Sequence, residues 1–154
     1  KIPFMVGLYR EEFRKEIKNI KPFKGIKNVF SELKKQNIRI GIVTTNSEGN
    51  VRKFLRCNGF INFDFINSGI GIFGKDRVIK AILEEYKLML NEVIVIGDEV
   101  RDVLAAKKIG IKIIAVAWGY NSDKILKQQN PDYLAQNSKQ LLKILKYWVN
   151  TKNL

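Results

Sequence analysis

The chain has 154 residues, 45% of them hydrophobic and 28% charged, as expected for one globular domain with its own core. The absence of histidine excludes His-dependent catalytic triads, histidine general bases and His-containing zinc sites, and the single cysteine, Cys57, excludes an internal disulfide. The net charge of +13 comes from lysines and arginines spread along the whole chain, without interleaved aromatic residues. This pattern indicates a solvated basic surface that helps to attract an anionic substrate, and we expect no nucleic-acid partner.

The first half of the chain alternates helical and extended patterns. Apolar residues recur at helical spacing in two segments, and Ser47 is placed to cap a third helix, which Asn58-Gly59 ends. In chain order, the predicted elements are a charged helical segment over 4–20, an amphipathic helix over 25–36, a strand over 38–43, a helix from Ser47 to Cys57, a short strand over 63–66, a glycine-rich loop over 68–74 and a helix that Lys75 begins.

The second half continues this alternation. Val93 to Ile96 are four consecutive β-branched aliphatic residues, a pattern typical of a parallel strand buried on both faces. In chain order, the other predicted elements are a helix over 102–109 ended by Gly110, a strand over 112–117, a helix over 123–129, an edge strand over 131–134 and a final amphipathic helix capped by Ser138. Strands that alternate with helices predict an α/β domain with three layers and a mainly parallel, Rossmann-like sheet.

Two carboxylates follow the strand over 93–96 directly. Asp98 and Asp102 lie on the turn into the next helix, at the end of the sheet where open α/β folds place their ligands. Helix capping could account for one carboxylate there. It accounts less well for a cluster of Asp98, Glu99 and Asp102, so we expect a site for a cation such as Mg²⁺.

Polar residues also follow the other strands. Thr44, Thr45 and Asn46 lie at a helix N-terminus, where free amide groups suit a phosphate, although a polar turn is the plainer interpretation. Lys75 begins a helix, the wrong end for the helix dipole, and an anionic partner would justify it. In a parallel sheet these residues and Asp98 would share one rim.

Three motifs in this order resemble motifs two, three and four of the haloacid dehalogenase-like hydrolases. They are Gly41-Ile42-Val43-Thr44-Thr45-Asn46-Ser47, then Phe73-Gly74-Lys75, then Val95-Ile96-Gly97-Asp98-Glu99-Val100-Arg101-Asp102. The segments 105–110, 115–120 and 130–134 resemble the phosphoglycolate phosphatase-like branch of that family. Together, the resemblance covers roughly residues 20 to 146.

The resemblance implies a Mg²⁺-dependent phosphatase that forms an aspartyl-phosphate intermediate. It implies that Thr44 hydrogen-bonds the transferred phosphoryl group, with the amides of Thr45 and Asn46 beside it. Lys75 would neutralise phosphate oxygens, Asp98 would ligate Mg²⁺, and Asp102 would either support the metal site or position Lys75.

The first motif of the family, an Asp-x-Asp that supplies the nucleophile, is missing. The chain has aspartates only at positions 64, 76, 98, 102, 123 and 132, and no two are separated by one residue. We expect residues 1–20 to be the remnant of a helical cap and residues 21–154 to be the C-terminal portion of the α/β core, without its first central strand. Direct pairing of the strands that end at Thr44 and Gly97, a second molecule, or an N-terminal segment outside this chain would then complete the sheet.

Other functions compete with this one. A catalytically silent α/β module that binds an anion or a protein partner would keep Thr44 and Lys75 without chemistry of its own. A response-regulator receiver is rejected, because its acidic residues precede its threonine and lysine, whereas here Asp98 follows both.

The sequence also indicates where the protein works and with what. No apolar run is long enough to span a membrane, no signal peptide is evident, and Cys57 is the only cysteine, so we expect a reducing cytoplasm and no membrane partner. The expected substrate is a small phosphorylated metabolite, and a homo-oligomer is one possible assembly.

Overall fold

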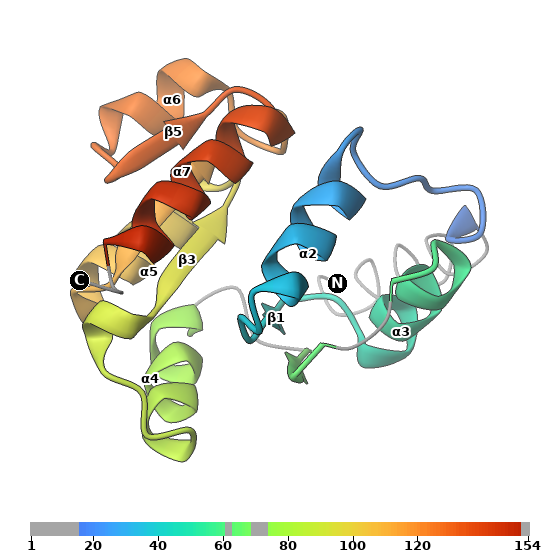
Figure 1. Cartoon of the computed structure of the whole chain (residues 1–154), viewed down its shortest axis with the longest axis horizontal. Helices are drawn as coiled ribbons and strands as arrows, with labels where there is room; N and C mark the ends of the chain where they lie inside the picture. Colours follow the sequence, from blue (N-terminus) through green and yellow to red (C-terminus); the bar gives the residue numbers. More distant parts are fainter. Residues whose placement is uncertain (1–15, 61–62, 69–73, 152–154) are drawn as a thin grey trace, which may run out of the picture. The chain divides into compact units, whose positions relative to one another are not determined.

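The computed structural model describes residues 16–60, 63–68 and 74–151. It divides into two compact units, one up to Gly74 and one from Lys75 onward (Figure 1). The predicted helix over 4–20 lies largely outside the described residues. The predicted boundary between a cap remnant and a core at residue 20 stays a prediction.

The described part of the first unit contains a parallel pair of short strands and the helices α2 (Ile26–Lys35) and α3 (Glu48–Cys57). Gly41 pairs with Phe65 and Val43 with Asn67. Phe30 packs edge-to-face on both Phe60 and Phe63, with ring centroids 5.3 Å apart in each pair. The strands are β1 (Gly41–Val43) and β2 (Phe65–Asn67).

Local sequence explains the ends of α3. The Ser47 hydroxyl accepts a hydrogen bond from the Asn50 amide at 3.4 Å, which confirms the predicted cap. At the other end, Gly59 adopts a left-handed conformation with φ 68°, as Asn58-Gly59 predicted. The side chain of Cys57, the last residue of the helix, is exposed.

The second unit holds a three-stranded parallel sheet of order β3-β4-β5. Gly97, at the end of β3, is paired with Ala115 of β4, and Ala115 with Leu134 of β5. The last strand lies at the edge of this sheet, as predicted. The elements are α4 (Lys75–Glu85), a short 3₁₀ helix (Leu90–Glu92), β3 (Ile94–Gly97), α5 (Val100–Ile109), β4 (Lys112–Val116), α6 (Asp123–Gln128), β5 (Tyr133–Ala135) and α7 (Ser138–Asn150).

The centre of this unit is β4, which is buried on both faces. Ile113 and Ala115 pack with Val103 and Ala106 of α5 and with Leu126 of α6. Ile114 and Val116, which point to the opposite face of the strand, are 0% and 7% exposed. Helices therefore cover a parallel sheet in layers, and the predicted α/β class is confirmed.

Some sequence predictions need correction. Ile96 of β3 is 44% exposed, so the expectation of a strand buried on both faces is wrong. The reason is position, because β3 lies at the edge of its sheet and β4 is central. The cap of α7 is Asn137, whose side chain accepts from the Gln140 amide at 3.0 Å, and Ser138 is the first helical residue.

Each unit has its own sheet, with strand order β1-β2 in the first unit and β3-β4-β5 in the second. The three ways to complete the sheet, which are direct pairing of β1 with β3, a second molecule, or an N-terminal segment outside this chain, stay predictions. No helix among the described residues is long and apolar enough to cross a membrane.

Each sheet carries a carboxylate that binds the neighbouring strand. Asp64, just before β2, accepts hydrogen bonds from the Ile40 amide at 2.6 Å and from Lys34 at 2.7 Å. Asp132, just before β5, accepts from the Ile113 amide at 3.0 Å and from Lys112 at 2.6 Å. These contacts lie at the N-terminal ends of the strands, opposite the ends that carry the predicted site residues.

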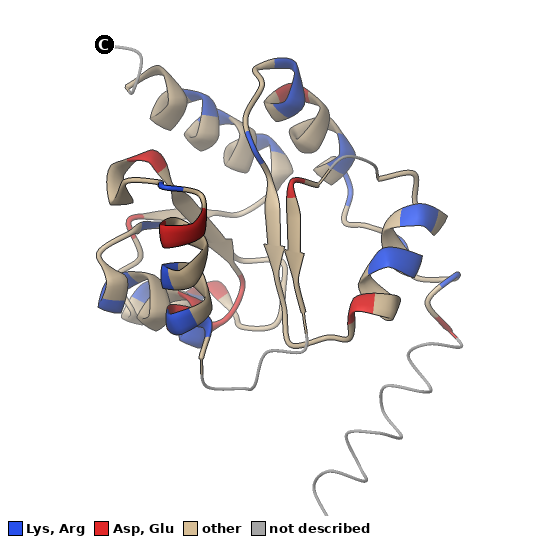
Figure 2. Ribbon diagram, turned by 90° about the horizontal axis from the view of Figure 1, so that it is seen from below, with Lys and Arg blue, Asp and Glu red and all other residues tan. Residues whose placement is uncertain are grey.

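Basic residues are distributed over several helices. Figure 2 shows Lys and Arg on helices of both units and not on one element alone. This distribution agrees with a solvated basic surface.

Candidate active site

The carboxyl end of β3 turns sharply into α5, and two features make that turn. The Asp102 carboxylate accepts a hydrogen bond from the Glu99 amide at 3.2 Å, which satisfies a free amide at the start of the helix. The Asp102 side chain also folds back onto Gly97, where a β-carbon would overlap it. Glycine at position 97 is therefore required by this close approach.

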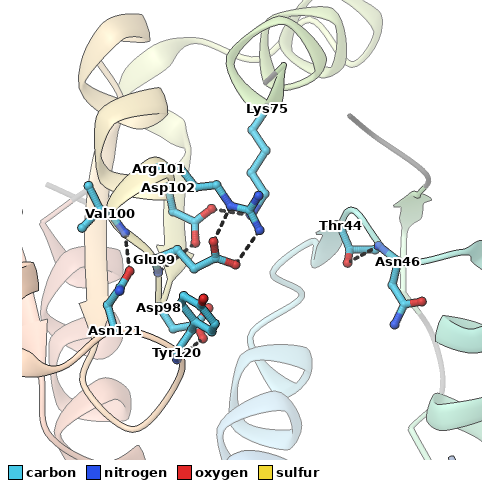
Figure 3. Close-up of polar contacts among 10 residues, drawn as sticks. All are labelled: Thr44, Asn46, Lys75, Asp98, Glu99, Val100, Arg101, Asp102, Tyr120 and Asn121. Atoms are coloured by element: carbon cyan, nitrogen blue, oxygen red, sulfur yellow. Dashed lines mark hydrogen bonds and ion pairs between the residues drawn. The ribbon is translucent and has the colours of Figure 1, made fainter. Parts of the chain in front are cut away.

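Lys75 forms an ion pair with Asp102. The Lys75 ammonium donates to Oδ1 of Asp102, and the two side chains are only 17% and 5% exposed (Figure 3). Lys75 is the first residue of α4, where the helix dipole disfavours a cation, and the Asp102 carboxylate compensates for that position. Both oxygens of Asp102 are thus engaged by protein groups.

Asp98 is bound by the loop that follows β4. Its Oδ2 accepts a hydrogen bond from the Tyr120 amide at 2.7 Å, and its carbonyl accepts from the Asn121 amide at 3.0 Å. The Asn121 side chain in turn accepts from the Val100 amide at 2.9 Å (Figure 3). The second carboxylate oxygen of Asp98, Oδ1, has no hydrogen-bond partner within the described ranges.

Glu99 does not join the other two carboxylates. Arg101 donates from Nη2 to Oε1 of Glu99 at 2.8 Å. The pKa of Arg101 is raised above its ordinary value, chiefly by the hydrogen bond to Glu99. Burial acts in the opposite direction, and the charges of Glu99, Asp102 and Asp98 add to the increase. The described residues contain no group of three or more acidic or cysteine side chains suited to a metal, so Glu99 adds no third carboxylate to Asp98 and Asp102. The pair Asp98 and Asp102 as a metal site stays a prediction.

The threonine segment lies in the first unit, where β1 meets α3. The Thr44 amide continues the pairing of β1 with β2 by donating to the Asn67 carbonyl at 2.9 Å, and Thr44 Oγ1 accepts from the Asn46 amide at 3.1 Å. Oδ1 of Asn46 accepts from the Ser47 amide at 2.8 Å and from Asn50 Nδ2 at 3.2 Å. Thr45 is half-buried beside them.

The structure therefore gathers the predicted residues into two groups. Lys75, Asp98 and Asp102 belong to one unit, and Thr44, Thr45 and Asn46 belong to the other. Their convergence on a single rim stays a prediction.

Sequence reasoning missed two residues of the loop after β4. Gly119 lies against the Asp98 carboxylate, and Asn121 connects that turn to the start of α5. Their position directly after a strand, the same signal that identified Asp98, could have singled them out.

Comparisons with known proteins identify the family that the chain matches. The family model described as "Haloacid dehalogenase-like hydrolase" matches residues 1–116. A phosphoglycolate phosphatase from Synechococcus elongatus is 31% identical over 121 residues, which are 78% of this chain and 57% of that protein. The pyrophosphatase PpaX of Bacillus velezensis is 29% identical over 156 residues, covering 91% of this chain and 67% of that protein.

A solved structure gives the same result. A haloacid dehalogenase-like family hydrolase from Streptococcus pneumoniae superposes with a TM-score of 0.79 at 26% identity, covering 94% of this chain and 70% of that one. The chain spans only 57%, 64% and 54% of three of the curated relatives it matches.

Proposed function

The chain belongs to the haloacid dehalogenase-like hydrolase family, and we propose that it is part of a phosphatase that hydrolyses small phosphate monoesters through an aspartyl-phosphate intermediate. The observation that carries this proposal is the ion pair of Lys75, at the start of α4, with Asp102, which follows Asp98 on the turn from β3 into α5. A nearly buried lysine held by a carboxylate, next to a second carboxylate with an open oxygen, suits the charge compensation that phosphoryl transfer needs.

Lys75 would neutralise phosphate oxygens. Its ion pair with Asp102 limits the positions that its ammonium group can adopt, so that less order must be imposed when substrate binds. Since both oxygens of Asp102 are engaged by Lys75 and by the Glu99 amide, positioning Lys75 is the role that these contacts favour for Asp102.

Asp98 is the residue that would hold Mg²⁺, whereas the oxygens of Asp102, the second predicted carboxylate, are engaged by Lys75 and the Glu99 amide. Oxygen donors suit this ion, which keeps several water ligands and needs only one or two carboxylates from a protein. Oδ1 of Asp98 is open among the described residues, and Gly119 puts no side chain against the carboxylate. The ion would supply positive charge to the phosphate and to the attacking group.

Thr44, Thr45 and Asn46 would bind the phosphoryl group at the start of α3. Thr44 Oγ1 accepts a hydrogen bond from the Asn46 amide through a lone pair. The hydroxyl hydrogen of Thr44 can donate to a phosphate oxygen at the same time.

A catalytically silent module that binds an anion or a protein partner is the second candidate. It is favoured by one observation, that no two aspartates of this sequence form an Asp-x-Asp. For the phosphatase we infer a small phosphorylated metabolite as ligand, and under either proposal we infer a cytoplasmic location. A homo-oligomer, or a segment outside this chain, would complete the sheet.

Activity assays separate the two candidates. We expect the 154-residue chain to show no turnover of p-nitrophenyl phosphate with Mg²⁺, and a longer protein that adds an upstream Asp-x-Asp to hydrolyse it. In that longer protein, Asp98→Asn should abolish turnover, whereas the matched surface change Asp123→Asn should not. Turnover by the 154-residue chain alone would contradict the expectation that this chain lacks the nucleophile. A longer protein that binds phosphate but does not hydrolyse phosphate esters would favour the silent module.

A further inference from the structure

An apolar cavity of about 430 Å³ lies within the first unit, beside the threonine segment. Its walls come from the segment before α2, from both helices, from β1 and from the chain after α3. Among its lining residues, the phenylalanines at positions 23, 30, 54, 60 and 63 stand out. None of the lining residues is charged.

The cavity has a polar part, and that part includes predicted phosphate ligands. Thr44 and Asn46 belong to the lining, as does Asn50, which is 4% exposed and donates from Nδ2 to Oδ1 of Asn46. All other lining residues are apolar. This polar part is small, because the hydroxyl and amide groups contribute little of the cavity surface and apolar side chains, aromatic and aliphatic, form nearly all of it.

This lining selects the chemistry of a ligand. A carboxylate or a second phosphate in the aromatic part would lose its hydration, and no charged residue in the lining would compensate for that loss. The Lys27 ammonium lies 5.8 Å from the centroid of the Phe60 ring but does not line the cavity. An apolar ring has no favourable hydration to lose there, and it can pack against several phenylalanine rings. The volume lies within the range of ordinary small-molecule sites.

We propose that this cavity binds the apolar, ring-bearing part of a phosphate ester whose phosphate lies against Thr44 and Asn46. The inference rests on the proposed function for its phosphate end and adds a substrate class to it, esters of aromatic or similarly apolar alcohols. Phe23, which lines the cavity and is 58% exposed, provides a ring that the ligand can cover.

Calorimetric titration of the 154-residue chain tests this inference with three probes, which are 1-naphthyl phosphate, inorganic phosphate and 1-naphthol. We expect 1-naphthyl phosphate to bind at least about tenfold more tightly than inorganic phosphate, because it buries an apolar ring in addition. Phe23→Ala should weaken the binding of 1-naphthyl phosphate severalfold and leave the binding of inorganic phosphate unchanged. Phe23 takes part in none of the ring pairs of the described residues, so this change should not unfold the unit.

Tyr147→Ala is the matched control, because it removes a ring that is 62% exposed on α7 in the other unit. This substitution should leave the affinity of all three probes unchanged. Equal binding of the two phosphates would overturn the inference and leave the proposed phosphatase function standing. If neither phosphate binds, the proposed phosphate site fails as well. Binding of 1-naphthol as tight as that of its phosphate would also overturn the inference, because the polar part would then contribute nothing.

Discussion

Gly119 and Asp98 approach so closely that a β-carbon at position 119 would overlap the Asp98 carboxylate. The contact joins the loop after β4 to the turn after β3, and the amides of Tyr120 and Asn121 reinforce it. The conformation of Asp98 therefore depends on a loop about twenty residues further along the chain.

Gly119→Ala should displace Asp98 and destabilise the protein. Forcing a methyl group into an occupied site costs about 1 to 3 kcal/mol, which urea unfolding can measure. Gly49→Ala is the control, since a β-carbon there meets nothing within 4 Å. That change should raise the free energy of unfolding by up to about 1 kcal/mol. Equal effects of the two substitutions would contradict the packing of Gly119 on Asp98.

Lys75→Met should lower stability, because it leaves the Asp102 carboxylate, 5% exposed, without its cation. Breaking a largely buried pair from one side costs about 3 kcal/mol. Replacing both residues, as in Lys75→Met with Asp102→Leu, should recover part of that loss, and the double-mutant cycle gives the coupling energy. The control is Lys127→Met, which removes an exposed pair with Asp123 and should leave the unfolding midpoint unchanged.

Asn121→Ala should loosen the start of α5, because Val100 loses the acceptor for its amide. The loss of one hydrogen bond costs about 1 kcal/mol, and the most direct measurement is hydrogen exchange of the Val100 amide, which should become faster. Asn121→Asp keeps a side-chain acceptor and should preserve protection. If both variants exchange at the wild-type rate, Asn121 does not position this turn.

Acid should weaken the protein through Asp64 and Asp132. Burial raises the pKa of Asp132, but the hydrogen bonds from Lys112 and the Ile113 amide outweigh it, so that its pKa lies below the ordinary 3.8. The pKa of Asp64 is lowered in the same way, by Lys34 and the Ile40 amide against burial. A lowered folded-state pKa contributes stability that is present above pH 3.8 and is lost as the pH falls through the folded-state pKa values.

Unfolding midpoints measured between pH 6 and pH 2 test this, and the slope below about pH 4 should be smaller for Asp132→Asn than for the wild type. A further reduction is expected when Asp64→Asn is added. Parallel curves for all three proteins would show that these carboxylates do not govern the acid response.

Local sequence predicted the helices well because their signals are local. The apolar spacing of α2, the Ser47 cap of α3 and Gly110 after α5 act within a few residues. The exposure of Ile96 could not be predicted, because it depends on whether another strand pairs with β3. Adjacent polar residues also left the cap of α7 ambiguous, and Asn137 takes that place ahead of Ser138.

The candidate site was predictable residue by residue but not as a network. Lys75 and Asp102 were identified separately, and only the fold shows that they form an ion pair. The aromatic cavity was not predictable, since its rings come from two parts of the chain that lie 24 to 40 residues apart in sequence, and each ring alone is an ordinary core residue.

The exposed thiol of Cys57 provides a site for a label that reports ligand binding. As the only cysteine of the sequence, it can be labelled with a single maleimide fluorophore. At about 1.5 Å per residue, the ten residues of α3 place the label about 15 Å from the end of the helix that carries Ser47. Such a label would sit outside the threonine segment and could report ligand binding there by a change in emission.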